Sequence, residues 1–126
     1  MNKVYPKWSE LPNLDLYLDQ VLLYVNQLDS SSIVDDDKGL TSAMINNYVK
    51  NGHLDKPIKK KYNRKQLARL IVITCLKNVF SIQEISNTIN SLTSDGSSEE
   101  MYDNFVMCMN GEKREGLADV IVAACD

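Results

Sequence analysis

Signals for the ends of helices recur along this chain, and they constrain its fold more than any other feature. Five polar residues that can cap a helix stand before stretches in which apolar residues return every three or four positions. Three of these caps, Asn63, Ser81 and Ser97, have Gln or Glu three residues later, which completes the capping-box pattern. Such a series predicts an all-α fold. We predict helices over residues 14–28, 41–51, 63–79, 82–92 and 98–109, with a last short helix at 117–124.

The second and third predicted helices have the clearest character. Thr41 can cap the second helix, and Leu40 and Ile45 are spaced to form a hydrophobic staple around that cap. Gly52 can close the same helix in the left-handed conformation. The third helix carries apolar residues on more than one stripe, so we expect it to be the central and most buried one.

Between these two helices the sequence indicates a basic projection. Pro57 forbids a continuous helix, and residues 58–62 are long enough for one arm of a short hairpin or for an extended wing. Lys59, Lys60 and Lys61 are three successive lysines on this segment. We therefore expect their side chains to protrude into solvent.

The charge of the chain is divided very unevenly. Residues 50–77 hold nine of the fourteen Lys and Arg residues against a single acid, Asp55, so this window carries +8. The remainder holds five basic and sixteen acidic residues and carries −11. A compact basic segment is typical of a protein that binds a phosphate backbone. The alternative is a solvated helical face that keeps the protein soluble.

Other patterns argue against an enzyme and against a membrane protein. Three widely spaced cysteines and the single His53 indicate neither a disulfide framework nor a metal site, and no glycine-rich phosphate loop or hydrolase motif occurs. We therefore expect no cofactor. No apolar run reaches the ~20 residues of a membrane span, and the start lacks a secretory signal, so we expect a cytoplasmic protein. We divide it into a helical domain, residues 1–92, and a short C-terminal helical appendage, residues 93–126.

Three segments, residues 39–54, 59–73 and 81–85, resemble in order the MerR-type winged helix-turn-helix. That family has a recognition helix with an I-R-x-Y core ending in G-L-L, a basic wing closing on Tyr, and later helices with L-x-x-L-x-x-I and S-L-x-E-I. The matching residues are Ile45, Tyr48, Gly52, Leu54, Tyr62, Leu67, Leu70, Ile73 and those from Ser81 to Ile85. The runs M-I-N-N-Y-V-K and P-I-K-K-K-Y-N-R-K-Q-L-A-R-L are also similar to a family of small bacterial proteins known mainly as a domain of unknown function. Both resemblances imply a helical winged fold.

These patterns lead to the hypothesis of a sequence-specific DNA-binding transcriptional regulator. The helix over residues 41–51 would enter the major groove of double-stranded DNA, and the wing over residues 58–62 would contact phosphates. A homodimer is expected, because one small domain offers few contacts for a specific site. The residues identify no small-molecule effector. The base-reading candidates are Ser42, Asn46 and Asn47, and the phosphate-contacting candidates are Lys50, Lys59, Lys60, Lys61, Arg64, Lys65 and Arg69.

The alternative hypothesis is a protein-interaction module whose basic surface docks an acidic partner, without enzymatic activity. Salt would weaken binding in both cases. Only a DNA-binding regulator would have an affinity that depends on the sequence of the duplex.

Overall fold

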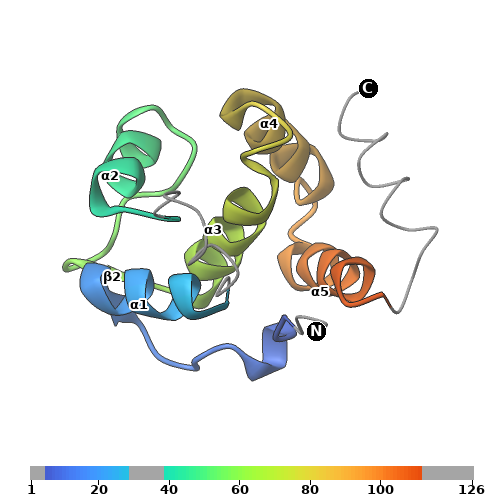
Figure 1. Ribbon diagram of the computed structural model, residues 1–126, viewed down its shortest axis with the longest axis horizontal. Coiled ribbons are helices and arrows are strands. Elements are labelled where there is room, and N and C mark those ends of the chain that lie inside the picture. The colour runs from blue at the N-terminus through green and yellow to red at the C-terminus, as the bar shows by residue number, and fades with distance from the viewer. Residues whose placement is uncertain (1–4, 29–38, 112–126) are drawn as a thin grey trace.

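Helix α3 (Arg64–Leu76) lies at the centre of the fold and contacts three of the other helices (Figure 1). The computed structural model describes residues 5–28 and 39–111. Helices α1 and α2 lie on one side of α3, whereas α4 and α5 lie on the other (Figure 1). The remaining elements are η1 (Trp8–Glu10), β1 (Leu16–Tyr17), α1 (Leu18–Leu28), α2 (Ser42–Lys50), β2 (Lys61–Tyr62), α4 (Ile82–Leu92) and α5 (Ser98–Met109).

Three of the five predicted helix starts are made by the expected side chains. Asn63 accepts a hydrogen bond from the backbone N–H of Gln66 at 2.9 Å, and the Gln66 side chain accepts one from the Asn63 N–H at 2.7 Å. Ser81 and Glu84 form the same reciprocal capping box at the start of α4. The Thr41 hydroxyl accepts a hydrogen bond from the third residue of α2. Each cap satisfies backbone donors that a helix leaves free at its first turn.

The first helix begins later than predicted. It starts at Leu18 instead of residue 14, because Leu16–Tyr17 forms a strand that pairs antiparallel with Lys61–Tyr62. A helix that began at residue 14 would prevent this strand pairing and lose its hydrogen bonds. The contact with the distant strand therefore outweighs the helical spacing of the apolar residues. Leu14, the first residue of the predicted helix, is 66% exposed. The fold of the described residues is thus mostly helical with one small two-stranded sheet, and not strictly all-α.

One further boundary and one helix cap differ from the prediction. Helix α3 ends at Leu76 instead of residue 79, and the chain turns there through a hydrogen bond from the Phe80 N–H to the Leu76 carbonyl. Helix α5 follows Ser97 as predicted, but the Ser97 hydroxyl donates to the Leu92 carbonyl and does not cap the helix. The predicted helix at 117–124 lies outside the described residues, as does most of the segment between the first two predicted helices.

One hydrophobic core joins all five helices of the described residues. Val21 and Ile45 are fully buried on the α1 and α2 side, and Tyr102 and Phe105 of α5 are fully buried on the other. The predicted central helix is confirmed as the most buried one, since its buried residues lie all around its axis. No helix within residues 5–28 and 39–111 combines the length and the apolar character that a membrane crossing requires.

The N-terminal segment is fastened to α5 by hydrogen bonds. The Trp8 N–H donates to the Asp103 carboxylate at 2.8 Å, and the Tyr102 hydroxyl donates to the Pro6 carbonyl at 2.8 Å. The Tyr5 N–H donates to the side-chain oxygen of Asn110 at 2.7 Å, and the Asn110 side-chain amide donates to the Tyr5 carbonyl at 3.1 Å. We call residues 5–8 the N-terminal strap. It closes the core over α5.

Candidate nucleic-acid interface

Helix α2 is held on α1 by a side-chain clamp at its entry. The Asn26 amide donates to the Leu40 carbonyl, and the Leu40 N–H donates back to the Asn26 carbonyl oxygen, both at 2.9 Å. Gly39 has φ +67°, and a Cβ there would lie 2.6 Å from the same Asn26 oxygen, so this position requires glycine. Ile45 and Tyr48 then bury the inner face of α2. The opposite face remains open to solvent.

The open face of α2 carries the predicted base-reading residues. Ser42, Asn46, Asn47 and Lys50 are all exposed. The Asn47 side-chain oxygen accepts a hydrogen bond from the Asn51 amide at 2.9 Å, so part of its bonding capacity is used within the helix. The side chains of Ser42 and Asn46 make no hydrogen bond to any residue that the structure describes. These two side chains, one helical turn apart, therefore have their full bonding capacity available to a ligand.

Gly52 ends α2 as predicted and directs the chain toward the basic projection. It has φ +80°, its N–H donates to the Val49 carbonyl at 3.2 Å, and the His53 N–H donates to the Tyr48 carbonyl at 2.8 Å. This pair of bonds is the Schellman arrangement, in which glycine supplies the left-handed residue.

The predicted projection is a tight hairpin with lysines at its turn. Ile58 and Lys61 exchange two backbone hydrogen bonds, both at 3.0 Å, around a two-residue loop. The loop residues Lys59 and Lys60 both have positive φ, 53° and 67°, which is the type I′ turn that normally contains Asn-Gly. Both side chains are exposed. We call residues 58–62 the lysine hairpin. Its backbone places two strained lysines at the tip.

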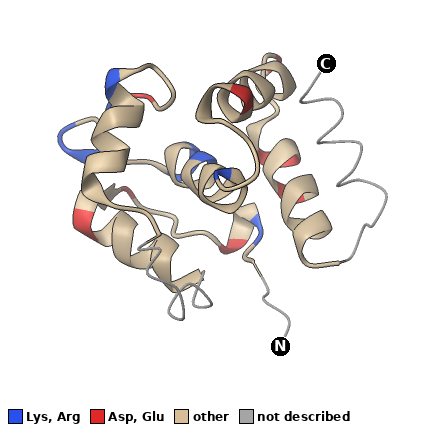
Figure 2. Cartoon of the chain, turned by 45° about the horizontal axis from the view of Figure 1, so that its top comes forward, with Lys and Arg blue, Asp and Glu red and all other residues tan. Residues whose placement is uncertain are grey.

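The third lysine of the run is held differently. The Lys61 ammonium lies 5.1 Å from the centre of the Tyr17 ring, within the range of a cation–π contact. Lys61 is half-buried because its strand pairs with β1. Figures 1 and 2 agree that the lysine hairpin and α2 lie toward the same end of the molecule, and basic positions mark both segments in Figure 2.

The three basic residues of α3 form a separate group. Arg69 is half-buried: its Nε donates to the His53 carbonyl, and its Nη2 donates to the Ser86 hydroxyl at 2.9 Å. Burial lowers the pKa of Arg69, while the nearby Asp55 carboxylate raises it. The Nε of Arg64 is buried and has no hydrogen-bond partner among the described residues. In Figure 2 the basic positions of α3 lie near the centre of the molecule.

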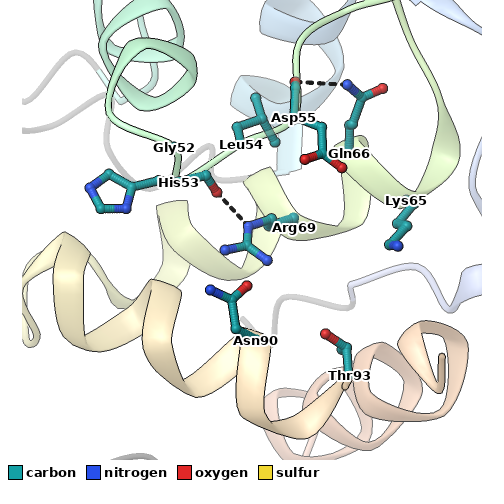
Figure 3. Close-up of a pocket in the computed structure, with 9 residues that line it drawn as sticks. All are labelled: Gly52, His53, Leu54, Asp55, Lys65, Gln66, Arg69, Asn90 and Thr93. Carbon is teal, nitrogen blue, oxygen red and sulfur yellow. Dashed lines mark hydrogen bonds between the residues drawn. The ribbon is translucent and has the colours of Figure 1, made fainter. Parts of the chain in front are cut away.

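Lys65 and Arg69 line a polar cavity of about 140 Å³, which Figure 3 shows between the segment after α2, helix α3 and the end of α4. Sequence reasoning did not identify this cavity. His53 and Asn90, which lie 37 positions apart in the chain, meet there only because α3 brings their segments together. No spacing pattern in the sequence marks such a meeting. The lining residues are Gly52, His53, Leu54, Asp55, Lys65, Gln66, Arg69, Asn90 and Thr93.

Comparison with known proteins supports one of the two resemblances. The sequence model of the family described as "Domain of unknown function (DUF1836)" matches residues 6–105. Searches of curated proteins and of solved structures found no match. The predicted membership in a family known as a domain of unknown function is thus confirmed, whereas the MerR-type winged helix-turn-helix stays a prediction. Because the match covers most of the chain, including α2, the lysine hairpin and the polar cavity, the protein belongs to the DUF1836 family.

Proposed function

We propose that the protein is a sequence-specific DNA-binding regulator, in which α2 enters the major groove and the lysine hairpin contacts phosphates. One observation carries the proposal: α2, whose polar residues are exposed, and the exposed lysine turn lie toward the same end of the molecule (Figure 2). A groove-reading helix flanked by a basic hairpin combines base contacts with backbone contacts, and specific DNA binding requires both.

The size and chemistry of α2 support its role in reading bases. Its nine residues give a helix about 14 Å long, and a helix fits within the major groove of B-form DNA. Asn46 presents an amide that can donate and accept at once, which matches the N6 and N7 edge of adenine. Asn47 is less suited to this role because Asn51 already occupies its oxygen. Asn46 is therefore our principal base-reading residue, with Ser42 beside it.

The lysine hairpin suits phosphates better than bases. Lysine ammonium groups are compact point charges without the planar fork that recognises guanine, and two of the three lie at an exposed turn. The hairpin is tied to the body of the protein through the pairing of β2 with β1. Because the hairpin is anchored in this way, a contact between a lysine at its tip and a phosphate would fix the position of α2 on the duplex.

The arrangement of elements also supports the proposal. The pair α1 and α2, the lysine hairpin, α3 and the capped α4 follow each other in the order of the MerR-type winged helix-turn-helix. We propose that the protein acts as a homodimer on DNA, since one such domain buries too little surface for a specific site. We exclude Arg69 from the proposed interface, because its guanidinium already bonds to His53 and Ser86.

The test begins with selection of bound sites from a random duplex pool. On the selected site, Asn46→Ala should cost about 1–3 kcal/mol of binding free energy, with a much smaller loss on random duplex. Asn87→Ala is the matched control, since Asn87 is also an exposed helical asparagine but lies on α4. Equal losses on both duplexes would make Asn46 a phosphate contact. Failure to select any site would favour the protein-interaction module with an acidic partner.

A further inference from the structure

Helix α4 packs on the core with one side and leaves its other side open. Ile85 and Ile89 are buried, together with Ser86 and Thr88. The open side carries uncharged polar residues that return every three or four positions, so they share one face of the helix. We call them the uncharged face of α4. Its residues are Gln83, Asn87, Asn90 and Ser91.

The surface around this face is poor in charge. Nine residues from 78 to 94 are exposed, and Glu84 is the only charged one among these described residues. One oxygen of its carboxylate is engaged, because it accepts a hydrogen bond from the Ser81 N–H in the capping box. In the rest of the described chain, 12 of 29 exposed residues are charged. Such local depletion of charge is typical of surfaces that are buried against another protein.

An exposed apolar residue lies at the N-terminal end of α4. Val79, in the turn that leads into the helix, is 73% exposed, the largest fraction among the exposed large apolar residues that the structure describes. Phe80 and Ile82, which follow it in the chain, are half-buried against the core. The turn therefore adds apolar surface to the uncharged helix, and apolar surface without charge is what the centre of a protein interface contains.

A surface of this composition can pair with a copy of itself. In a two-fold symmetric dimer, residues near the axis meet the same residues of the second copy. A charged residue there would face its own charge and be repelled. An amide or a hydroxyl can both donate and accept, so it can face an identical group without a penalty of this kind. The absence of charge on α4 therefore favours a second copy over a partner that carries a strong charge.

We propose that the uncharged face of α4 is an isologous homodimer interface. The choice of a second copy rests in part on the proposed function, which requires two copies on DNA. Figure 1 shows α2 and α4 on opposite sides of α3, so a copy bound at α4 leaves α2 open to a duplex. The face is one helix wide, and its eleven residues span about 16 Å. An interface this small forms a weak dimer, which appears at high protein concentration.

Sedimentation equilibrium of the full chain without DNA tests the proposal by an exchange of charge at Asn87, in the middle of the face. The wild type should dimerise reversibly as its concentration rises. Asn87→Lys and Asn87→Glu should each weaken the dimer by about tenfold or more, because like charges then meet across the axis. An equimolar mixture of the two variants at low salt should regain a dimer with one copy of each. Both substitutions favour a helix at least as well as Asn, so the variants should stay folded.

Two matched controls accompany these variants. Asn87→Ala keeps the face uncharged and removes a side chain whose oxygen is already bonded to the Gln83 amide, so it should leave the dimer unchanged. Asn46→Lys makes the same change of charge on the open face of α2 and should also leave the dimer unchanged. Equal weakening by Asn46→Lys and Asn87→Lys would mean that only net charge matters, which would overturn the proposal.

Two further results would contradict the interface. A wild type that stays monomeric up to millimolar concentration forms no such dimer. A mixture of Asn87→Lys and Asn87→Glu that stays monomeric would show that this residue does not face its own copy. The measurement contains no DNA, so it separates the two proposals. A dimer that ignores duplex sequence would refute the regulator alone, and a monomer that binds a selected site would refute the interface alone.

Discussion

Replacing the turn of the lysine hairpin by Lys59→Asn and Lys60→Gly should make the protein more stable and a weaker DNA binder. Both lysines have positive φ, 53° and 67°. The left-handed conformation costs an ordinary residue about 1–2 kcal/mol, so the wild-type turn carries roughly twice that in strain. Asn tolerates this conformation and Gly adopts it freely. Gly also loses more chain entropy on folding, which offsets about 0.5–1 kcal/mol of the gain in stability.

The net gain for Lys59→Asn with Lys60→Gly is therefore about 1–2 kcal/mol of unfolding free energy, or a melting temperature higher by about 4–8 °C. Thermal and urea unfolding measure this change. In the same variant two phosphate contacts are lost, so the slope of log affinity against log salt should fall by about 1.8. Stability and DNA affinity should thus move in opposite directions.

The matched control is Lys59→Gln with Lys60→Gln, which removes both charges and keeps the strained backbone. It should lose the same DNA affinity without the rise in melting temperature. If this control gained as much stability as the Asn-Gly variant, the gain would come from relief of charge repulsion and not from the turn. An Asn-Gly variant no more stable than the wild type would refute the type I′ turn itself.

Four other predictions follow from single features. Alanine at all of residues 59–61 should weaken selected and random duplexes alike in filter-binding assays, and a tenfold change in their ratio would mean that the hairpin reads bases. Ser81→Ala should cost about 1 kcal/mol in urea unfolding through loss of the helix cap. Hydrogen bonds from the Ser81 N–H and hydroxyl lower the pKa of Glu84 below its ordinary 4.5, so unfolding free energy should decline as pH falls below about 4.5, and Glu84→Gln should reduce that decline. Thr74→Val should raise the unfolding free energy by about 1 kcal/mol, since the buried Thr74 hydroxyl has no partner among the described residues; a loss instead would reveal a bound water.

Features that depend on neighbours in sequence could be predicted well. Asn63 and Ser81 cap their helices with residues three positions away, and Gly52 closes α2 through bonds to the turn before it. Each of these interactions is complete within a few residues, so the local pattern contains all the information needed. The same locality explains why the exposed face of α2 could be identified from spacing alone.

Features that depend on distant partners could not be predicted. The apolar residues of 14–28 do have helical spacing, but Leu16–Tyr17 pairs with a strand more than forty positions later. No residue near Leu16 indicates that partner. Likewise the sequence places Arg69 among basic residues, whereas the fold turns its guanidinium toward His53 and Ser86. An arginine that positions a loop and one that contacts a ligand look the same until the tertiary structure is known.

The N-terminal strap has a consequence for how the chain is made in the cell. Tyr5 is synthesised 105 positions before its hydrogen-bond partner Asn110. Trp8 and Pro6 are likewise synthesised long before their hydrogen-bond partners, Asp103 and Tyr102. Until α5 is synthesised, the apolar surface of α3 that α5 covers stays exposed in the nascent chain. Chaperones bind such surfaces, and a chain terminated before α5 would be prone to aggregate. The strap can therefore join the core only after α5 has been synthesised.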